Sequence, residues 1–305
     1  MPNSDFTLFY DEIYSSGLDT SARFPVDRYV KLSNKLKEID EAGIIDWKKP
    51  RMASREEVLH IHDASYVDRF LGQELNENEI RRIGLRPWKK TIVERTLRLM
   101  GGALGALEEV IEGKAIAGNM AGGTHHAFRD RGSGFCIFND LAICAIKAIE
   151  KFSYNKILII DLDVHQGDGT ASILKENEKV YTFSVHCKQN FPFKKETSNT
   201  DIEIESGADD RTYLNMLKES LGALRPVKSD IIFFQAGVDT LSTDRYGKLS
   251  LTTKGINERN KLVFDFARKR KNPVLILMGG GYSEPIDNTV TAFRDLFIEA
   301  AKYSY

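Results

Sequence analysis

The sequence predicts a single-domain α/β protein with three layers (α/β/α), in which helices cover both faces of a central, mostly parallel sheet. After about residue 115, short apolar segments alternate with helical ones, which is typical of buried parallel strands joined by crossover helices. Aspartate, histidine and tyrosine residues, whose side chains can bind metals or transfer protons, follow several of these strands. Because the carboxyl ends of parallel strands meet at one edge of a sheet, we expect a functional site there.

Each expected element rests on its local pattern. Buried strands are expected where apolar residues run without a break, as in KILIIDLD and DIIFFQAG. Strands of this kind lie at 156–163, 180–185, 230–237 and 273–280. The helices around them are expected at 139–151, 168–176, 209–223, 252–270 and 286–303.

The chain before about residue 110 is expected to be mostly helical. Apolar residues recur at helical spacing over 22–41, and a longer helical pattern covers 90–112. Ser54 and Glu57 form a capping-box pattern ahead of an apolar pair, which predicts the start of a helix. No repeat, low-complexity tract or linker is evident, so a single domain over residues 1–305 is expected.

The composition argues against several classes of function. The 305 residues include 43 Lys and Arg against 44 Asp and Glu, so there is no basic excess and direct nucleic-acid binding is not expected. No apolar run approaches the ~18 residues of a transmembrane helix, and no secretory signal is evident, so no membrane association is expected. Three cysteines indicate a reducing compartment, and the cytoplasm is the expected location. The oligomeric state stays open.

A metal-binding pattern follows the first of these strands, in the segment DLDVH (161–165). Residues two apart in an extended segment point to the same side, so Asp163 and His165 can face one ion. Asp239 ends the next strand but one along the chain. Two carboxylates and one imidazole make a three-ligand set with open positions, as in catalytic zinc sites. The alternative for DLDVH alone is a capped strand end.

Two adjacent histidines, His125 and His126, lie in a glycine-flanked loop. Beside a metal motif they suggest a proton-handling pair, although either could be a structural group. An imidazole in this role needs an acceptor for its second nitrogen, and Asp161 and Asp168 are the available carboxylates. We therefore expect Asp161 behind His125 and Asp168 behind His126.

Tyr282 follows the three glycines Gly279–Gly281, which let the backbone approach a ligand closely. A phenol in that position can donate a hydrogen bond to a developing oxyanion. A phosphate-binding loop is the alternative, but the stretch is not GxGxxG and lacks a Walker lysine. His60 and His62 are interpreted as structural, and Cys136 as a packed thiol.

These motifs together resemble the zinc-dependent histone deacetylase family, which has the arginase/deacetylase fold. They occur in order as GGTHHAFRDRGSGFCIFND, IIDLDVHQGDGT, FSVH, QAGVDTL and GGGY. The segments RFPVDRY (23–29) and LRPW (85–88) further resemble the class IV branch and its bacterial relatives. Gln166 stands where class I members usually have a second histidine, and the 85–90 segment lacks the substrate-clamping aspartate of class I.

The resemblance implies a catalytic machinery with one Zn²⁺ per chain. His126 would act as general base and then acid, with His125 as its electrostatic partner, and Tyr282 would polarise the substrate carbonyl. Asp161 and Asp168 would be the partners of the two histidines. The implied zinc ligands are Asp163, His165 and Asp239.

The resemblance also implies two further sites. Gly134, Phe135 and Phe191 would line a tunnel for the acyl-lysine side chain, and Gly280 would offer a backbone carbonyl. A structural K⁺ or Na⁺ ion would lie near the metal loop. Its expected ligands are Asp161, Asp163, His165, Ser184 and Val185.

The activity implied is hydrolysis of an Nε-acyl-lysine amide, with an acetyl or a longer fatty acyl group, in a protein or peptide. An acetylpolyamine or another small acylamine is the alternative substrate within the same fold. A two-metal amidohydrolase such as arginase is disfavoured, because Gln166-Gly167 after His165 supply no ligands for a second ion. A non-catalytic acyl-lysine-binding module is the remaining alternative.

Overall fold

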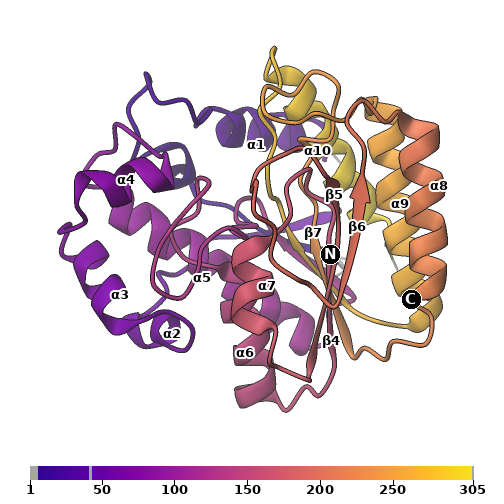
Figure 1. The fold of residues 1–305 in the computed structure, drawn as a ribbon, viewed down its shortest axis with the longest axis horizontal. Coiled ribbons are helices and arrows are strands. Elements are labelled where there is room, and N and C mark those ends of the chain that lie inside the picture. The colour runs from indigo at the N-terminus through magenta and orange to yellow at the C-terminus, as the bar shows by residue number, and fades with distance from the viewer. Residues whose placement is uncertain (1–5, 41–42, 304–305) are drawn as a thin grey trace.

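Helices cover both faces of one eight-stranded sheet in the computed structural model, which describes residues 6–40 and 43–303 (Figure 1). All strand pairs are parallel, and the order across the sheet is β2-β1-β3-β8-β7-β4-β5-β6. The strands are β1 (Phe6–Phe9), β2 (Ile45–Lys48), β3 (Ile116–Asn119), β4 (Ile157–Asp161), β5 (Val180–Cys187), β6 (Thr200–Ile204), β7 (Ile231–Gln235) and β8 (Val274–Leu277). The predicted three-layer α/β/α class is confirmed, with a sheet that is parallel throughout.

The helices divide between the two faces of the sheet. They are α1 (Arg28–Ile39), α2 (Arg55–Leu59), α3 (Ala64–Leu71), α4 (Glu77–Ile83), α5 (Ile92–Ile111), α6 (Asp140–Phe152), α7 (Asp168–Leu174), α8 (Asp210–Ala223), α9 (Thr253–Arg270) and α10 (Asp287–Ala301), with a 3₁₀ turn at Glu12–Ser15. Helices α1, α8, α9 and α10 pack together on one face, and α5, α6 and α7 on the other (Figure 1). Helices α2, α3 and α4 lie beyond α5.

Most predicted helices are present. Helices α5 to α10 correspond in order to the six long helical patterns expected from residue 90 onward. The capping box at the start of α2 is formed, with Glu57 N donating to Ser54 Oγ (3.2 Å) and Ser54 N to Glu57 Oε2 (2.9 Å). Helix α1 begins at Arg28 rather than near residue 22, because the preceding residues form turns.

Four strands were not predicted: β1, β2, β3 and β6. The first three have only four residues each, which is short for a recognisable pattern. Strand β8 is equally short, but it lies in the longer apolar run at 273–280. Strand β6 (TDIEI) is polar and half-buried because it is the edge of the sheet. The expectation that the first 110 residues are mostly helical is therefore wrong for the two strands that build the opposite edge.

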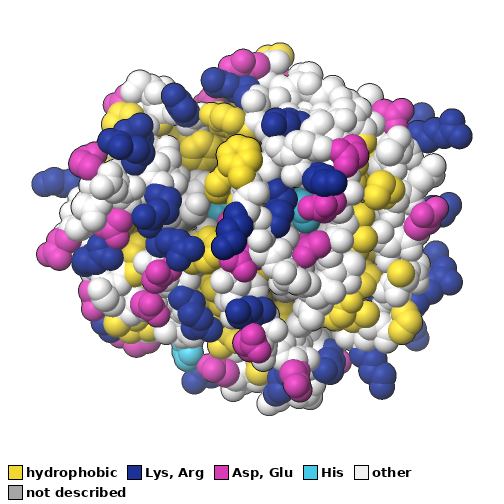
Figure 2. All heavy atoms as spheres, in the orientation of Figure 1, with side chains coloured by type: hydrophobic (Ala, Val, Ile, Leu, Met, Phe, Trp, Pro, Cys, Tyr) yellow, Lys and Arg dark blue, Asp and Glu magenta, His cyan; other side chains and the backbone are white. Residues whose placement is uncertain are grey.

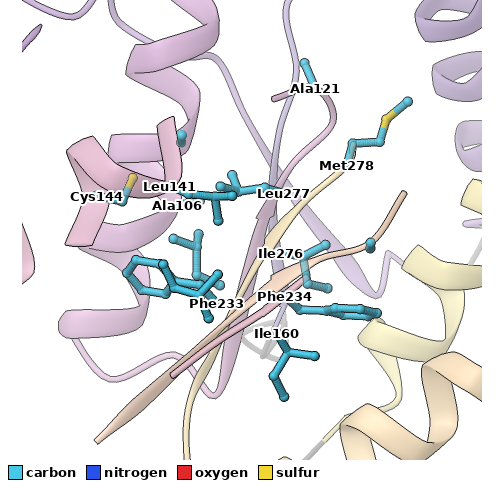
Figure 3. Packing of buried hydrophobic residues seen from close by; sticks show 14 of the residues in the cluster. Ala106, Ala121, Leu141, Cys144, Ile160, Phe233, Phe234, Ile276, Leu277 and Met278 are labelled. Carbon is cyan, nitrogen blue, oxygen red and sulfur yellow. The ribbon is translucent and has the colours of Figure 1, made fainter. Parts of the chain in front are cut away.

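Buried side chains on the central strands pack against both helical layers (Figure 3). Phe233 points toward the side where Leu141 of α6 lies, whereas its neighbour Phe234 points to the other side. There Phe234 packs against Phe264 of α9, with ring centroids 6.0 Å apart. The alternation of side chains along a strand thus joins both layers to one core.

Candidate active site

A cavity of about 480 Å³ opens where the carboxyl ends of the strands meet. The loops that follow β3, β4, β5, β7 and β8 all contribute to its wall, as expected for a parallel α/β sheet. The cavity brings together most of the residues selected from the sequence. These are His125, His126, Gly134, Phe135, Asp163, His165, Phe191, Asp239, Gly280 and Tyr282.

Asp163, His165 and Asp239 each place a potential ligand atom within 4.8 Å of the others. Nδ1 of His165 lies 3.1 Å from Asp163 Oδ1 and 3.2 Å from Asp239 Oδ2. Backbone amides hold the carboxylates in place: Gly280 N donates to Asp163 Oδ2 and Val164 N to Asp239 Oδ1, both at 2.8 Å. A side chain at Gly280 is impossible, since its Cβ would lie 2.1 Å from Asp239.

The triad fits a metal ion because a cation would balance the charges of its two buried carboxylates. Burial, together with the charge of Asp163, raises the pKa of Asp239 to about 7. Burial lowers the pKa of His165, but Asp163 and Asp239 outweigh it and raise the value to about 10. A divalent cation between the two buried carboxylates would relieve this excess of negative charge. One imidazole nitrogen and two carboxylate oxygens also form a donor set that suits zinc.

His125 and His126 each donate from Nδ1 to a buried carboxylate. The distances are 2.7 Å from His125 to Asp161 Oδ2 and 2.6 Å from His126 to Asp168 Oδ1. These are the pairings expected from the sequence. With Nδ1 engaged in this way, the Nε2 atom of each ring is left for other contacts.

The two histidines differ in charge. Burial lowers the pKa of His125, but the carboxylates of Asp161 and Asp163 raise it overall to about 9. Burial and the neighbouring charge of His125 lower the pKa of His126 to about 4, although Asp168 opposes them. At neutral pH His125 is therefore a cation, and His126 is neutral and able to accept a proton.

The loop that carries the histidines is held by Asp140, which the sequence analysis did not select. Its carboxylate accepts from Gly123 N, Thr124 N and Thr124 Oγ1, each at 2.8 Å. His62 supports the same region, since it contacts the Phe128 carbonyl through Nδ1 (2.9 Å). His62 is buried outside the cavity, in agreement with its predicted structural role.

Tyr282 has its hydroxyl-bearing ring at the cavity wall and its backbone fixed by Asp244. Tyr282 N donates to Asp244 Oδ2 at 2.6 Å, and the same carboxylate accepts from Tyr246 N and Gly247 N. Burial raises the pKa of the Tyr282 phenol well above its usual value, so the hydroxyl stays protonated and can donate. Asp244 was missed because nothing in its local sequence distinguishes it from a loop residue.

Aromatic residues form the walls near the histidines. Phe191 packs edge-on against His126, with centroids 4.9 Å apart, and Phe135 lies 5.5 Å from the Tyr282 ring. A Cβ at Gly134 would lie 2.5 Å from the His126 ring, so only glycine lets this loop come so close. Cys136, also at the wall, is buried, and burial raises the pKa of its thiol well above the ordinary value, as expected of an inert packed thiol.

Two of the residues expected to bind a monovalent cation, Asp163 and His165, belong to the triad. Ser184 is level with Asp161 in the neighbouring strand, and Val185 is fully buried. The Ser184 hydroxyl lies 2.9 Å from Nδ1 of His186. The role of these residues as ion ligands stays a prediction.

The sequence is similar to that of proteins from one known family. The histone deacetylase domain family matches residues 23–295. An uncharacterised protein of Picosynechococcus sp. is 39% identical over 93% of this chain and 95% of its own length. Histone deacetylase 2 of Arabidopsis thaliana is 29% identical over 80% of this chain and 64% of its own length. The acetoin utilization protein AcuC of Staphylococcus aureus is 30% identical over 76% of this chain and 65% of its own length.

A solved structure has the same fold. The HD domain of HDA15 superposes with a TM-score of 0.80 at 18% identity, over 97% of this chain and 88% of that one. Within the described residues, none of the helices has the length and apolar character needed to cross a bilayer.

Proposed function

The chain belongs to the histone deacetylase family, and on this premise we propose that it is a metal-dependent hydrolase of Nε-acyl-lysine amides in proteins or peptides. The observation that carries the proposal is the convergence of three groups in one cavity. These are the Asp163–His165–Asp239 triad, the neutral His126 and the protonated Tyr282. We propose one catalytic domain over residues 1–305.

The triad would hold one Zn²⁺ ion through Asp163, His165 and Asp239. Bound there, zinc supplies a Lewis acid that polarises an amide carbonyl and lowers the pKa of water. The choice of zinc rests on the mixed nitrogen and oxygen donor set and on the three-ligand count, which leaves positions open for substrate.

Side chains of the cavity would supply proton transfer and stabilise the negative charge that develops on the substrate oxygen. His126 accepts a proton from the attacking water, and the same imidazole later gives that proton to the lysine amine as it leaves. Asp168 keeps the His126 ring in the orientation that exposes Nε2. Tyr282 donates its hydroxyl hydrogen to the oxygen that becomes negative during attack. The positive charge of His125, oriented by Asp161, stabilises the same negative charge.

The acyl-lysine side chain would enter past Phe135 and Phe191, beside Gly134, with the carbonyl of Gly280 at the inner end. The alternative substrate, an acetylpolyamine or other small acylamine, is kept because AcuC, a relative named for acetoin utilization, matches this chain. The charge of the cavity favours the lysine substrate. Its lining includes the exposed cations Arg82 and Lys248, which repel a polyamine, and within the described chain its only acidic residues are Asp163 and Asp239.

Several finer expectations remain predictions. They are a K⁺ or Na⁺ ion near Asp161, Ser184 and Val185, the relation to class IV, a cytoplasmic location, and the absence of direct nucleic-acid binding. On the face in Figure 2, Lys and Arg side chains are interspersed with Asp and Glu and form no continuous basic patch, which supports the last of these.

The test is hydrolysis by zinc-loaded protein of two matched lysine peptides, one acetylated and one with a long fatty acyl group. We expect release of free lysine, measured as kcat/KM for each peptide, and loss of release after chelation. Faster acetyl turnover indicates a general deacetylase, and faster long-chain turnover indicates a defatty-acylase. Turnover of acetylpolyamine but of neither peptide contradicts the lysine proposal.

A further inference from the structure

Two buried arginines, Arg28 and Arg95, line the cavity beyond the catalytic groups. Their exposed fractions are 2% and 3%. Neither guanidinium forms an ion pair with a carboxylate among residues 6–40 and 43–303. A buried cation without a counter-ion is costly, because the charge has lost its water. Two of them at one cavity therefore need an explanation.

Their protein contacts leave binding capacity unused. Arg28 donates to the carbonyls of Gly281 (2.9 Å) and Gly279 (3.2 Å) and to the Tyr29 hydroxyl (3.0 Å), while its Nε has no partner. For Arg95, the Nε donates to the Tyr14 carbonyl at 3.0 Å. The Tyr29 side chain is a further partner of Arg95. None of these partners is a carboxylate, although the charge of Asp239 also acts on Arg28.

A third buried arginine, Arg259, provides an internal comparison. Its guanidinium donates to three backbone carbonyls and to the side-chain oxygen of Asn260. It does not line the cavity. Arg259 therefore has a structural role that its contacts explain, whereas Arg28 and Arg95 face a space where a ligand can bind.

The two guanidiniums lie close together and close to the reaction centre. Both stack on Phe24, with Cζ 4.7 Å (Arg28) and 5.6 Å (Arg95) from the ring centroid, and both lie within 6 Å of the Tyr29 ring. Cζ of Arg28 is 5.4 Å from the ring centroid of Tyr282. An acyl chain whose carbonyl accepts from Tyr282 therefore lies in the same cavity as these two cations.

We propose that Arg28 and Arg95 bind the distal carboxylate of an acyl group derived from a short dicarboxylic acid, such as succinyl or glutaryl. This inference rests on the proposed function and names its acyl substrate. A chain of four or five carbons places its second carboxylate about 4 to 5 Å beyond the amide carbonyl. Both guanidiniums line the same cavity as Tyr282, so they are available to such a carboxylate. An arginine is well suited to a carboxylate, because its planar fork makes two parallel hydrogen bonds.

The reaction is hydrolysis. The amide C–N bond breaks and the oxygen of water joins the acyl carbon. At neutral pH both hydrogens of that water end on the lysine nitrogen, so the products are a lysine ammonium and a dicarboxylate. The distal carboxylate takes no part in bond making. It anchors the substrate to Arg28 and Arg95, whereas an apolar acyl chain of equal length leaves both guanidiniums without a carboxylate.

The test compares acyl groups of equal carbon number on one lysine peptide: succinyl against butyryl, and glutaryl against pentanoyl. We expect kcat/KM to be about tenfold or more higher for the dicarboxylic member of at least one pair. Arg95→Met is expected to abolish that preference, and Arg95→Lys to retain part of it. Arg98→Met, on the same helix outside the cavity, is the matched control and leaves the ratio unchanged.

A preference for butyryl and pentanoyl in the wild type, or a ratio that Arg95→Met does not alter, overturns the inference. Calorimetry of the zinc-loaded protein separates this from failure of the proposed function. Glutarate and pentanoate each offer one carboxylate to the metal, so tighter binding of glutarate, lost in Arg95→Met, reports the arginine pair alone. That result without peptide hydrolysis supports the anion site and refutes the lysine substrate. Peptide hydrolysis with no preference for the dicarboxylic acyl groups and no tighter binding of glutarate supports the lysine substrate and refutes the anion site.

Discussion

The imidazole rings of His125 and His126 lie with centroids 4.1 Å apart, yet their pKa values are moved in opposite directions, to about 9 and about 4. Two carboxylates, Asp161 and Asp163, act on the first ring, while burial and the charge of its neighbour dominate at the second. Such separation within a pair of titratable groups is typical of acid–base pairs in active sites. It supports the roles proposed for the two residues, which are proton transfer for His126 and electrostatic stabilisation for His125.

The pH dependence of catalysis follows from this assignment. His126 must be neutral to accept a proton, and its pKa is lowered, so activity persists as the pH falls below 6.5. A divalent cation at the triad lowers the value further. We expect the acid limb of kcat/KM below pH 6, and a loss of about 10²–10⁴-fold in kcat for His126→Ala. An acid limb near pH 7 in the zinc-loaded enzyme contradicts the assignment.

Tyr282→Phe removes a hydroxyl and leaves the ring packing in place. If the phenol stabilises the developing oxyanion, kcat falls about 10²-fold or more. The metal content, measured by elemental analysis, is expected to stay at one per chain, because Tyr282 is outside the triad. Unchanged turnover in this variant removes the oxyanion role.

Asp239→Ala tests the triad directly. The substitution removes one of three ligand atoms and leaves Asp163 and His165. We expect loss of bound zinc as well as of activity, measured by equilibrium dialysis. Asp244→Asn is the comparison, since Asp244 contacts only backbone amides of the Tyr282 and Tyr246 segments. Stoichiometric zinc in Asp239→Ala refutes the ligand assignment.

Arg259→Met is expected to weaken metal binding without touching a ligand. The guanidinium donates to the carbonyls of Leu162, Ala236 and Gly237, which lie in the two segments that carry Asp163 and Asp239. Loss of such support typically costs about 10–100-fold in metal affinity. Competition with a fluorescent zinc chelator measures the change. Lys261→Met, on the exposed face of the same helix, serves as control, and equal affinities in the two variants contradict the prediction.

Acid stability depends on Glu57, which pairs with Arg51 (2.7 Å) and Lys147 (2.9 Å). Burial raises its pKa, but these cations and the capping bond to Ser54 lower it overall to about 2. A depressed folded pKa stabilises the protein above pH 4.5, and this contribution is lost as the pH falls toward 2. After allowance for solvent screening, we expect Glu57→Gln to lower the free energy of unfolding by about 1 kcal/mol at pH 7.

Urea unfolding at pH 7 and at pH 2.5 measures this difference, which should shrink at the lower pH. The exposed Glu176→Gln is the matched control, because its carboxylate reaches only Lys175 at 3.9 Å. A deficit in Glu57→Gln that does not change between the two pH values contradicts the linkage.

The sequence predicted the site better than the sheet that builds it. DLDVH, the histidine pair and GGGY are local patterns whose residue types are rarely combined by chance, so their chemistry is visible without coordinates. Strands β1, β2 and β3 have four residues each, and their pairing partners are far away in the chain. The order of strands along the chain did not reveal that β7, which Asp239 follows, lies directly beside β4 in the sheet.

By itself, the sequence determined the α/β class, the order of helices α5 to α10, and the residues proposed as metal ligands and proton-transfer groups, because periodicity and short motifs encode them locally. Only the tertiary structure decided which strands are neighbours, how Asp244 and Asp140 hold the catalytic loops, and that Arg28 and Arg95 share one cavity. Arg28 and Arg95 are 67 residues apart, and although Arg28 lies in the RFPVDRY segment, no local pattern links the two. Their relation to Tyr282 arises when α1, α5 and the loop after β8 pack together, since long-range packing alone brings such charges to one place.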